Sequence, residues 1–319
     1  MNSVFSSLIS IGAYMERFHT VGNAADRMPI GYTPTWYEKS WLSIFEERNE
    51  TLMYGFVIFI FHVSVYFLSY SVQFTFESIP ALQKYKIQQN MHVSDKEWWT
   101  GVRRFLENMF LIRLPTIMLF FPAVELLNFD ISVPFPPLYV ILLQTLFFMV
   151  ADDFWHYWTH RLLHVDYLYR KIHVIHHEYS APFGLIGDYS HPIESTSLAL
   201  TAISGPVMYS WLASSTGLFK EAHVIPIVLW IGVKTFVSLE VHTGYDFPWS
   251  LNNLIPIWAG ADYHDYHHMA YGNNFASMFR HMDFILGTDN GYHKFKKLKK
   301  MNQEKVLKER KDQKVKKDG

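Results

Sequence analysis

The sequence contains no cysteine among its 319 residues. This absence excludes disulfides, cysteine-ligated zinc, iron–sulfur clusters and thiol catalysis together. Any metal must therefore be held by histidine and oxygen ligands. The chain also lacks a dinucleotide-binding fingerprint of the GxGxxG type. Electrons for redox chemistry would have to arrive from a separate carrier.

Charged residues are scarce and unevenly placed. They make up 18% of the chain, against 50% hydrophobic and 17% aromatic residues, which indicates a membrane protein. The net charge of −1 conceals a basic tail, because residues 294–319 hold twelve Lys or Arg and only four Asp or Glu. We expect this tail to be solvated and poorly ordered, with about 1 kcal/mol of attraction to anionic lipid per basic residue near the surface.

Apolar runs predict helices that cross a membrane. Residues 53–70 carry no formal charge and have about the length of one span. The runs 105–127 and 138–150 flank a turn and predict one helical hairpin. The runs 193–212 and 224–241 predict a second. Within these runs, His62 is expected to be packed and hydrogen-bonded, and Lys234 to snorkel or to face the bundle interior.

Histidines are concentrated at the ends of these runs. Residues 152–177 alone hold six of the seventeen, and a spacing of three or four residues places side chains on one face of a helix. We therefore expect each cluster to present one face. The clusters follow the order HxxxH, HxxHH and HxxHH, and consist of His160 and His164, of His173, His176 and His177, and of His264, His267 and His268.

Eight imidazoles exceed the needs of one ion, so two metal ions are the economical interpretation. Neutral imidazole suits Fe, Zn, Cu and Ni. Zinc would explain hydrolysis, and iron would explain oxygen chemistry. The apolar and aromatic surroundings favour a lipid substrate and an oxidative role.

The phrases around the histidines resemble a known superfamily. HRLLH, HVIHHEYSAPFG, VHTGYDFPWSLNNLIPIWAGADYHDYHH and NNFASMFRHMDFILGTD are similar to the fatty acid hydroxylase/sterol desaturase superfamily. Within it they resemble the C4-methylsterol oxidases (sterol 4-alpha-methyl monooxygenases). The strong similarity covers about residues 145–292. The chain departs from these oxidases at Asp188, where they often carry Glu.

The resemblance implies a non-haem di-iron centre. The three boxes would hold the iron, with His242 as a further ligand after the second hairpin. His156 is expected to support the ligands by hydrogen bonding, His191 to be a ligand or to line the pocket, and Asp246 to be an oxygen ligand or a turn residue. Ligating imidazoles usually donate their outer N–H to a carboxylate or carbonyl. The carboxylates near the boxes that could accept are Glu178, Asp188, Glu194, Glu240 and Asp265.

The resemblance also implies a reaction and partners. The C4 methyl of a 4-methylsterol would be oxidised with O2 to alcohol, aldehyde and carboxylate. Electrons would come from NAD(P)H through cytochrome b5 and its reductase, and a downstream sterol C4-decarboxylase complex is a further expected partner. The boxes do not separate this activity from C5-sterol desaturation or fatty-acyl hydroxylation. A histidine-rich metal transporter is a distant alternative, because it would place ionisable residues along a mid-membrane path.

The expected fold class is all-α: an integral membrane protein with about four transmembrane helices in two hairpins and a cytosolic, helical, histidine-rich catalytic cap. The basic 71–104 loop and the basic tail place both hairpin ends in the cytosol. Lys316 and Lys317 resemble a KKxx retrieval signal, which predicts the endoplasmic reticulum. The expected parts are an N-terminal polar or interfacial segment (1–50) with a helix at 37–45 and a glycosylation triplet at Asn49, a membrane region (51–144), a fatty acid hydroxylase-like catalytic domain (145–292) and a basic cytosolic tail (293–319).

Overall fold

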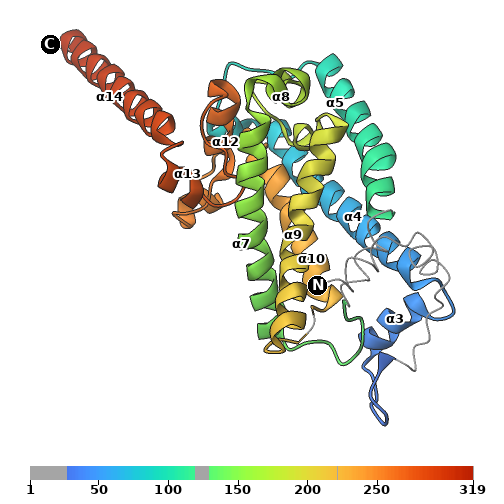
Figure 1. The fold of residues 1–319 in the computed structure, drawn as a ribbon. Coiled ribbons are helices and arrows are strands. Elements are labelled where there is room, and N and C mark those ends of the chain that lie inside the picture. Colours follow the sequence, from blue (N-terminus) through green and yellow to red (C-terminus); the bar gives the residue numbers. More distant parts are fainter. Residues whose placement is uncertain (1–26, 119–128, 221, 319) are drawn as a thin grey trace.

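The structure, a computed structural model, describes residues 27–118, 129–220 and 222–318. Across these ranges the regular elements are helical and no strand forms, so the predicted all-α fold is confirmed for the described chain. Long helices run side by side in the body of the molecule. Shorter helices lie around one end, and one long helix projects away from it (Figure 1).

Three helices of the described chain are long and apolar enough to cross a membrane. They are α4 (Glu50–Ser78), α7 (Leu138–Leu163) and α10 (Val224–Val241). With a rise of 1.5 Å per residue, even the 18 residues of α10 extend about 27 Å, close to the hydrocarbon thickness of a bilayer of about 30 Å.

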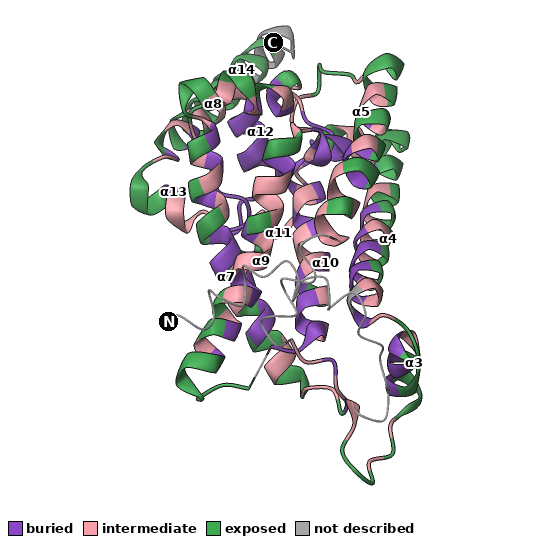
Figure 2. Cartoon of the chain, turned by 45° about the vertical axis from the view of Figure 1, so that its right-hand side comes forward, coloured by how far each residue is buried: buried purple, intermediate pink, exposed green. Residues whose placement is uncertain are grey.

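The outer faces of these helices are apolar and exposed. Ile60 and Leu68 on α4 are 61% and 70% exposed, and Leu143 on α7 is 63% exposed. Buried residues concentrate on the faces that the long helices turn toward one another (Figure 2). A surface of this kind is unfavourable in water but suits lipid chains. The outer faces of these three helices therefore suit a membrane environment.

The second predicted hairpin is present as α9 (Pro192–Thr216) followed by α10. Helix α9 packs along α7, and their close approach depends on Gly205, where a Cβ atom would lie 2.6 Å from Phe148 Cα. Small residues allow such packing between membrane helices. Helix α9 carries Glu194 and many Ser and Thr residues, and it falls short of the apolarity of the three spans above.

The first predicted hairpin is described only in part. Within 105–127, residues 105–107 end α5 (Asp95–Glu107), residues 108–113 form the π-helix η3 (Asn108–Arg113), and residues 119–128 lie outside the described residues. The other arm is longer than the predicted 138–150, because α7 continues to Leu163. Asp152 and Asp153 follow the apolar run, but the helix continues through them because both carboxylates have partners. Asp152 pairs with Lys234, and Asp153 accepts from backbone N–H groups.

The long helices meet the short ones at one end of the bundle. Helices α4, α7 and α10 end there and α9 begins there. In Figure 1 this is the end at which α8 and α12 are labelled. The short elements of the described chain are η2 (Pro80–Tyr85), α8 (Asp166–Lys171), η4 (His173–Glu178), η5 (Gly184–Asp188), α11 (Leu251–Leu254), α12 (Gly260–Ala270) and α13 (His281–Leu286).

The opposite end is closed by α3 (Trp36–Phe45), the helix predicted at 37–45. Thr35 and Glu38 form its capping box, and Trp41 Nε1 donates to the Ile131 carbonyl at 2.9 Å. Asn49, the first residue of the glycosylation triplet, caps α4 by accepting from the Leu52 N–H at 2.8 Å.

The basic tail forms α14 (Asn290–Asp318), which includes Lys316 and Lys317 and projects from the body (Figure 1). The expectation of a poorly ordered tail is therefore wrong for its described residues. The tail has no Gly or Pro before its last residue and is rich in Lys, Glu, Gln and Leu, which are strong helix formers.

Candidate metal centre

Nine histidines gather where α7, η4, α10 and α12 meet. Their ring nitrogens form two groups, and within each group the atoms lie within 4.8 Å of one another. The nine are the same histidines that the sequence predicts as ligands. Group one contains His160, His164, His173, His177 and His267, and group two contains His176, His242, His264 and His268.

Each HxxHH box divides between the two groups. The second box, on η4, sends His173 and His177 to group one and His176 to group two. The third box, on α12, does the reverse and sends only His267 to group one. Adjacent residues on an α-helix diverge by about 100°, so an HH pair cannot face one point. The expectation that each cluster presents one face is corrected for the two HxxHH boxes, each of which serves both groups, whereas His160 and His164 of the first box both belong to group one.

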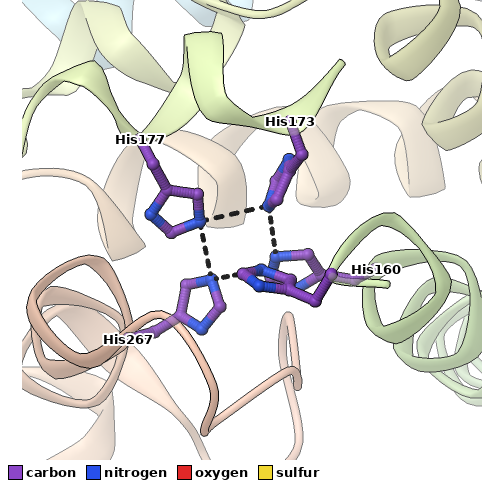
Figure 3. A group of neighbouring side chains, drawn as sticks. His160, His173, His177 and His267 are labelled. Carbon is purple, nitrogen blue, oxygen red and sulfur yellow. Dashed lines mark hydrogen bonds between the residues drawn. The ribbon is translucent and has the colours of Figure 1, made fainter. Parts of the chain in front are cut away.

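Short contacts between Nε2 atoms link the members of group one in an open series (Figure 3). His173 Nε2 lies 3.1 Å from Nε2 of both His160 and His177. His267 Nε2 lies 3.2 Å from Nε2 of both His177 and His164. His164, at the C-terminal cap of α7, is half-buried, whereas the other four members are buried.

Group two is built in the same way, and all its members are buried. His242, the C-terminal cap of α10, has its Nε2 3.2 Å from Nε2 of His176 and 2.9 Å from Nε2 of His264. His268 Nε2 lies 3.2 Å from His264 Nε2. Group two therefore depends on α10, which supplies no member of group one.

The outer nitrogens of these rings are held by carbonyl groups. His160 Nδ1 lies 2.9 Å from the Phe275 oxygen, and His242 Nδ1 lies 2.7 Å from the Ser238 oxygen. A carbonyl only accepts, so Nδ1 carries the proton and Nε2 keeps a lone pair. The remaining rings with such a partner are His176 on Tyr189, His267 on Asn273 and His268 on Tyr179.

This arrangement places lone pairs against each other. Nε2 of His176 and Nε2 of His242 are 3.2 Å apart, and carbonyls hold the proton of each ring on Nδ1. No hydrogen lies between these two acceptors, so the contact is repulsive unless a cation lies among the nitrogens. Burial lowers the pKa of His176 to about 4 and that of His242 to about 3, so both rings are neutral at pH 7. Neutral imidazole is the form that binds metal.

The spacing of the inner nitrogens fits a metal ion. Two nitrogens each about 2.1 Å from one ion are roughly 3.0 Å apart at a right angle and roughly 3.4 Å apart at a tetrahedral angle. The contacts of 2.9–3.2 Å lie close to this range. The inner nitrogens therefore have the spacing of ligands that share one metal ion.

One predicted carboxylate contacts a ligand candidate directly. Glu194 Oε1 lies 2.9 Å from His173 Nδ1, and both side chains are 1% exposed. A carboxylate behind a histidine fixes the ring and makes its inner nitrogen more basic. Helix α9 thereby supports group one without supplying a ligand.

The other predicted carboxylates have different partners. Asp188 pairs with Arg113, and Asp265 accepts from Gln88 at 2.8 Å. Glu178 accepts from the Tyr189 hydroxyl at 2.6 Å, and Glu240 from Trp258 Nε1 at 3.3 Å. Asp246 accepts from the amides of Asn252 and Asn253, which is the turn role.

The remaining predicted histidines lie outside both groups. His156 contacts Lys234 Nζ through Nδ1 at 3.2 Å. His191 caps α9 by accepting from the Ile193 N–H. Two further histidines that the sequence does not assign to the site, His281 and His293, are exposed in part and face Asp153 and Asp289.

Two buried aspartates were not foreseen as part of the site. Asp153 accepts from the backbone N–H groups of Met278 and Phe279 at 3.0 and 3.1 Å. Asp283 accepts from those of Phe275 and Ala276 at 2.9 and 2.8 Å. Together they fix the segment whose Phe275 carbonyl orients His160. For Asp153, the sequence does contain a signal. A carboxylate in an apolar helix requires buried partners, which marks it as a candidate structural or functional residue.

A cavity of about 210 Å³ opens onto both groups. His160 and His173 of group one and His176, His242 and His264 of group two line one part of it. Apolar residues of α4, α9 and α10 also line it, among them Ile58, Leu198, Ile203, Ile227 and Ile231, together with polar residues such as Arg113 and Lys234. The arrangement can hold an apolar molecule with one end at the histidines.

Comparison with known proteins places these features in a family. Residues 145–288 match the family model described as fatty acid hydroxylase. The chain is 39% identical to the C-4 methylsterol oxidase erg25 of Schizosaccharomyces pombe, over 81% of this chain and 85% of that protein. It is 35% identical to the methylsterol monooxygenase erg25B of Aspergillus fumigatus, over 91% and 94%. It is 34% identical to the very-long-chain aldehyde decarbonylase GL1-8 of Oryza sativa subsp. indica, over 85% and 97%. No solved structure matches the chain.

Proposed function

The chain belongs to the fatty acid hydroxylase family, and from that premise we propose that it is an O2-dependent monooxygenase that oxidises the C4 methyl of 4-methylsterols. The observation that carries the proposal is the pair of histidine groups facing an apolar cavity. A sterol is a rigid apolar molecule whose reacting methyl lies at one end. The cavity offers an apolar wall with the histidines at one end of it.

The nine histidines of groups one and two would hold two iron ions. Bound iron supplies the capacity to activate O2 and to oxidise an unactivated C–H bond, which no side chain of this chain can do. The fatty acid hydroxylase family match and the neutral imidazole donors support iron. The chain's own part is to fix each ring by its outer nitrogen, as Ser238, Phe275 and Glu194 do.

The cavity walls orient the substrate and exclude water. Three successive oxidations convert the methyl to alcohol, aldehyde and carboxylate, and each consumes one O2, two electrons and two protons. The first and third place one oxygen atom in the substrate and release one water. The second removes two hydrogens and releases two waters. Holding the methyl at one position accounts for the role of the rigid walls from α4, α9 and α10.

Electrons reach the centre from a separate protein in this proposal, because the sequence lacks a dinucleotide fingerprint. The carrier is cytochrome b5, supplied by NAD(P)H through its reductase. The basic helix α14 and the basic residues of η2 and α5 offer surfaces for an acidic carrier. A sterol C4-decarboxylase complex would take the carboxylate product.

The histidine end of the bundle faces the cytosol in this proposal, in the membrane of the endoplasmic reticulum. The cytosolic side is supported by the basic residues in α14 and in the 71–104 segment. A fourth crossing by α9 would complete the second predicted hairpin.

The aldehyde decarbonylase relatives favour a second candidate, an activity on very long-chain aldehydes. C5-sterol desaturation and fatty-acyl hydroxylation share the same histidine boxes. Because these activities act on different substrates, lipid analysis separates them.

Complementation tests the proposal. The full chain is expressed in yeast lacking its sterol 4-methyl oxidase, and sterols are measured by mass spectrometry. We expect growth without added sterol and loss of the accumulated 4-methylsterols, and no rescue by a His176→Ala variant of equal expression. Expressed, correctly located protein that leaves the 4-methylsterols unchanged would contradict the proposal. Alkanes formed from added long-chain aldehydes would favour the second candidate.

A further inference from the structure

A second polar cluster lies inside the membrane bundle, one turn of α7 before His160. Lys234 Nζ on α10 is 2.6 Å from Asp152 Oδ2 and 3.2 Å from His156 Nδ1, both on α7. The other oxygen of Asp152 is 2.8 Å from the Thr201 hydroxyl on α9. Three helices therefore fix the cluster.

The cluster presents two N–H donors. An ammonium group only donates, so His156 accepts through Nδ1. Beside this cation the ring stays neutral, and its proton lies on Nε2. Lys234 has three N–H groups and directs two of them at Asp152 and His156. Within the described part of the chain, neither the third N–H of Lys234 nor Nε2–H of His156 has a hydrogen-bond partner.

These two side chains line the same cavity as the histidine groups. Lys234 and His156 both border the cavity of about 210 Å³. The ring centroid of His156 is 5.7 Å from that of His160. His156 is thus close to group one, and Lys234 contacts His156.

Packing alone does not explain a lysine at this depth. Asp152 is 1% exposed and Lys234 is 17% exposed, and α7 and α10 are both candidate membrane spans. Well-packed apolar residues commonly stabilise a buried site as well as an ion pair does. Ionisable residues in a membrane segment usually mark a functional site. The ion pair with Asp152 neutralises the charge of Lys234. It does not explain the third N–H of Lys234 or Nε2–H of His156.

We propose that Lys234 and His156 hold the oxygen that the first oxidation places on the substrate, so that alcohol and aldehyde stay in the cavity until the carboxylate forms. This inference rests on the proposed function. The starting methyl accepts no hydrogen bond, whereas the alcohol and aldehyde oxygens do. The donors therefore bind the oxidised carbon of the intermediates and make no such bond to the starting methyl group.

A competition experiment tests the retention. The full chain in membranes is given deuterium-labelled 4-methylsterol, cytochrome b5, reductase, NADPH and an excess of unlabelled 4-hydroxymethyl sterol. The wild type is expected to carry label through to the carboxylate with little free labelled alcohol. In Lys234→Met and His156→Phe, the ratio of free labelled alcohol and aldehyde to labelled carboxylate should rise roughly tenfold, which corresponds to about 1.4 kcal/mol. Lys234→Arg keeps the charge and the donors and should restore most of the retention.

Two controls separate retention from folding. Lys234→Met leaves Asp152 buried without its partner, so the double variant Asp152→Asn, Lys234→Met removes both charges and should show the same product shift. Arg113→Gln removes the other cation of the cavity, which pairs with Asp188, and should leave the product ratio unchanged.

Equal loss of all three products in Lys234→Met and in the double variant, with an unchanged ratio, would overturn the inference. A larger shift in Arg113→Gln would also overturn it. If the wild type consumes no 4-methylsterol, the proposed function is wrong and the inference falls with it.

Discussion

The two histidine groups differ in how many imidazoles remain to hold an ion if one is removed. Group one has five imidazoles from α7, η4 and α12, and a carboxylate, Glu194, behind one of them. Group two has four imidazoles, all buried, and depends on His242 at the end of α10. An ion in group one can lose a ligand and keep four nitrogens, whereas an ion in group two would keep three. The difference predicts unequal responses to equivalent changes.

Removing His242 should have the largest effect. We expect His242→Ala to lower turnover of the 4-methylsterol at least about 100-fold and bound metal from about two ions to about one per chain, because group two would keep three nitrogens. Metal analysis of purified protein and turnover in membranes measure these effects. Retention of two ions with full turnover would show that group two is not a metal site.

Removing the carboxylate behind His173 should have a smaller effect, confined to group one. Glu194→Ala is expected to weaken metal binding there by about 10–100-fold, since a partner of the outer nitrogen fixes the ring. Metal retention during titration with a chelator measures it. Glu178→Ala is the matched control, because Glu178 is exposed and contacts the Tyr189 hydroxyl instead of a histidine. Equal weakening in both variants would contradict the role given to Glu194.

Removing His164 should cost less than removing His242. His164 is half-buried, and group one keeps four nitrogens without it. We expect His164→Ala to retain about two ions per chain and to lower turnover by roughly tenfold or less. A loss as severe as that of His242→Ala would show that the fifth imidazole is not a reserve.

The smallest effect is expected from the helix contact that holds α7 against α9. A Cβ at Gly205 would lie 2.6 Å from Phe148 Cα, so Gly205→Ala must shift one helix. We expect about 1–3 kcal/mol of lost stability, read as a lower temperature of unfolding in detergent. Metal loss at intermediate temperature should begin at group one, because α7 carries His160 and α9 carries Glu194. Loss that begins at group two would argue against this coupling.

The sequence predicts much of the site because imidazole spacing is a local signal. All nine ligand candidates, and the carboxylate Glu194 among five considered, could be named from the order of boxes and from the resemblance. The helical content and the α9–α10 hairpin follow from the apolar runs in the same way.

The division into two groups could not be predicted. Residue spacing indicates which side chains share a helix face, but not which of the two groups each ring joins. His176 and His177 are adjacent in sequence, yet they join different groups. Most outer nitrogens meet backbone carbonyls, which leave no mark in the sequence. The full length of α7 could not be predicted either. Asp152 and Asp153 are accommodated within the helix by partners that lie far along the chain.

The sharing of boxes has a consequence for how the centre assembles. Segment η4 and helix α12 each contribute to both groups, so an ion held in either group immobilises side chains that the other requires. The second ion then binds to a framework whose conformational entropy has already been lost. In the wild type, loading should therefore be cooperative, with few chains carrying a single ion when metal is limiting.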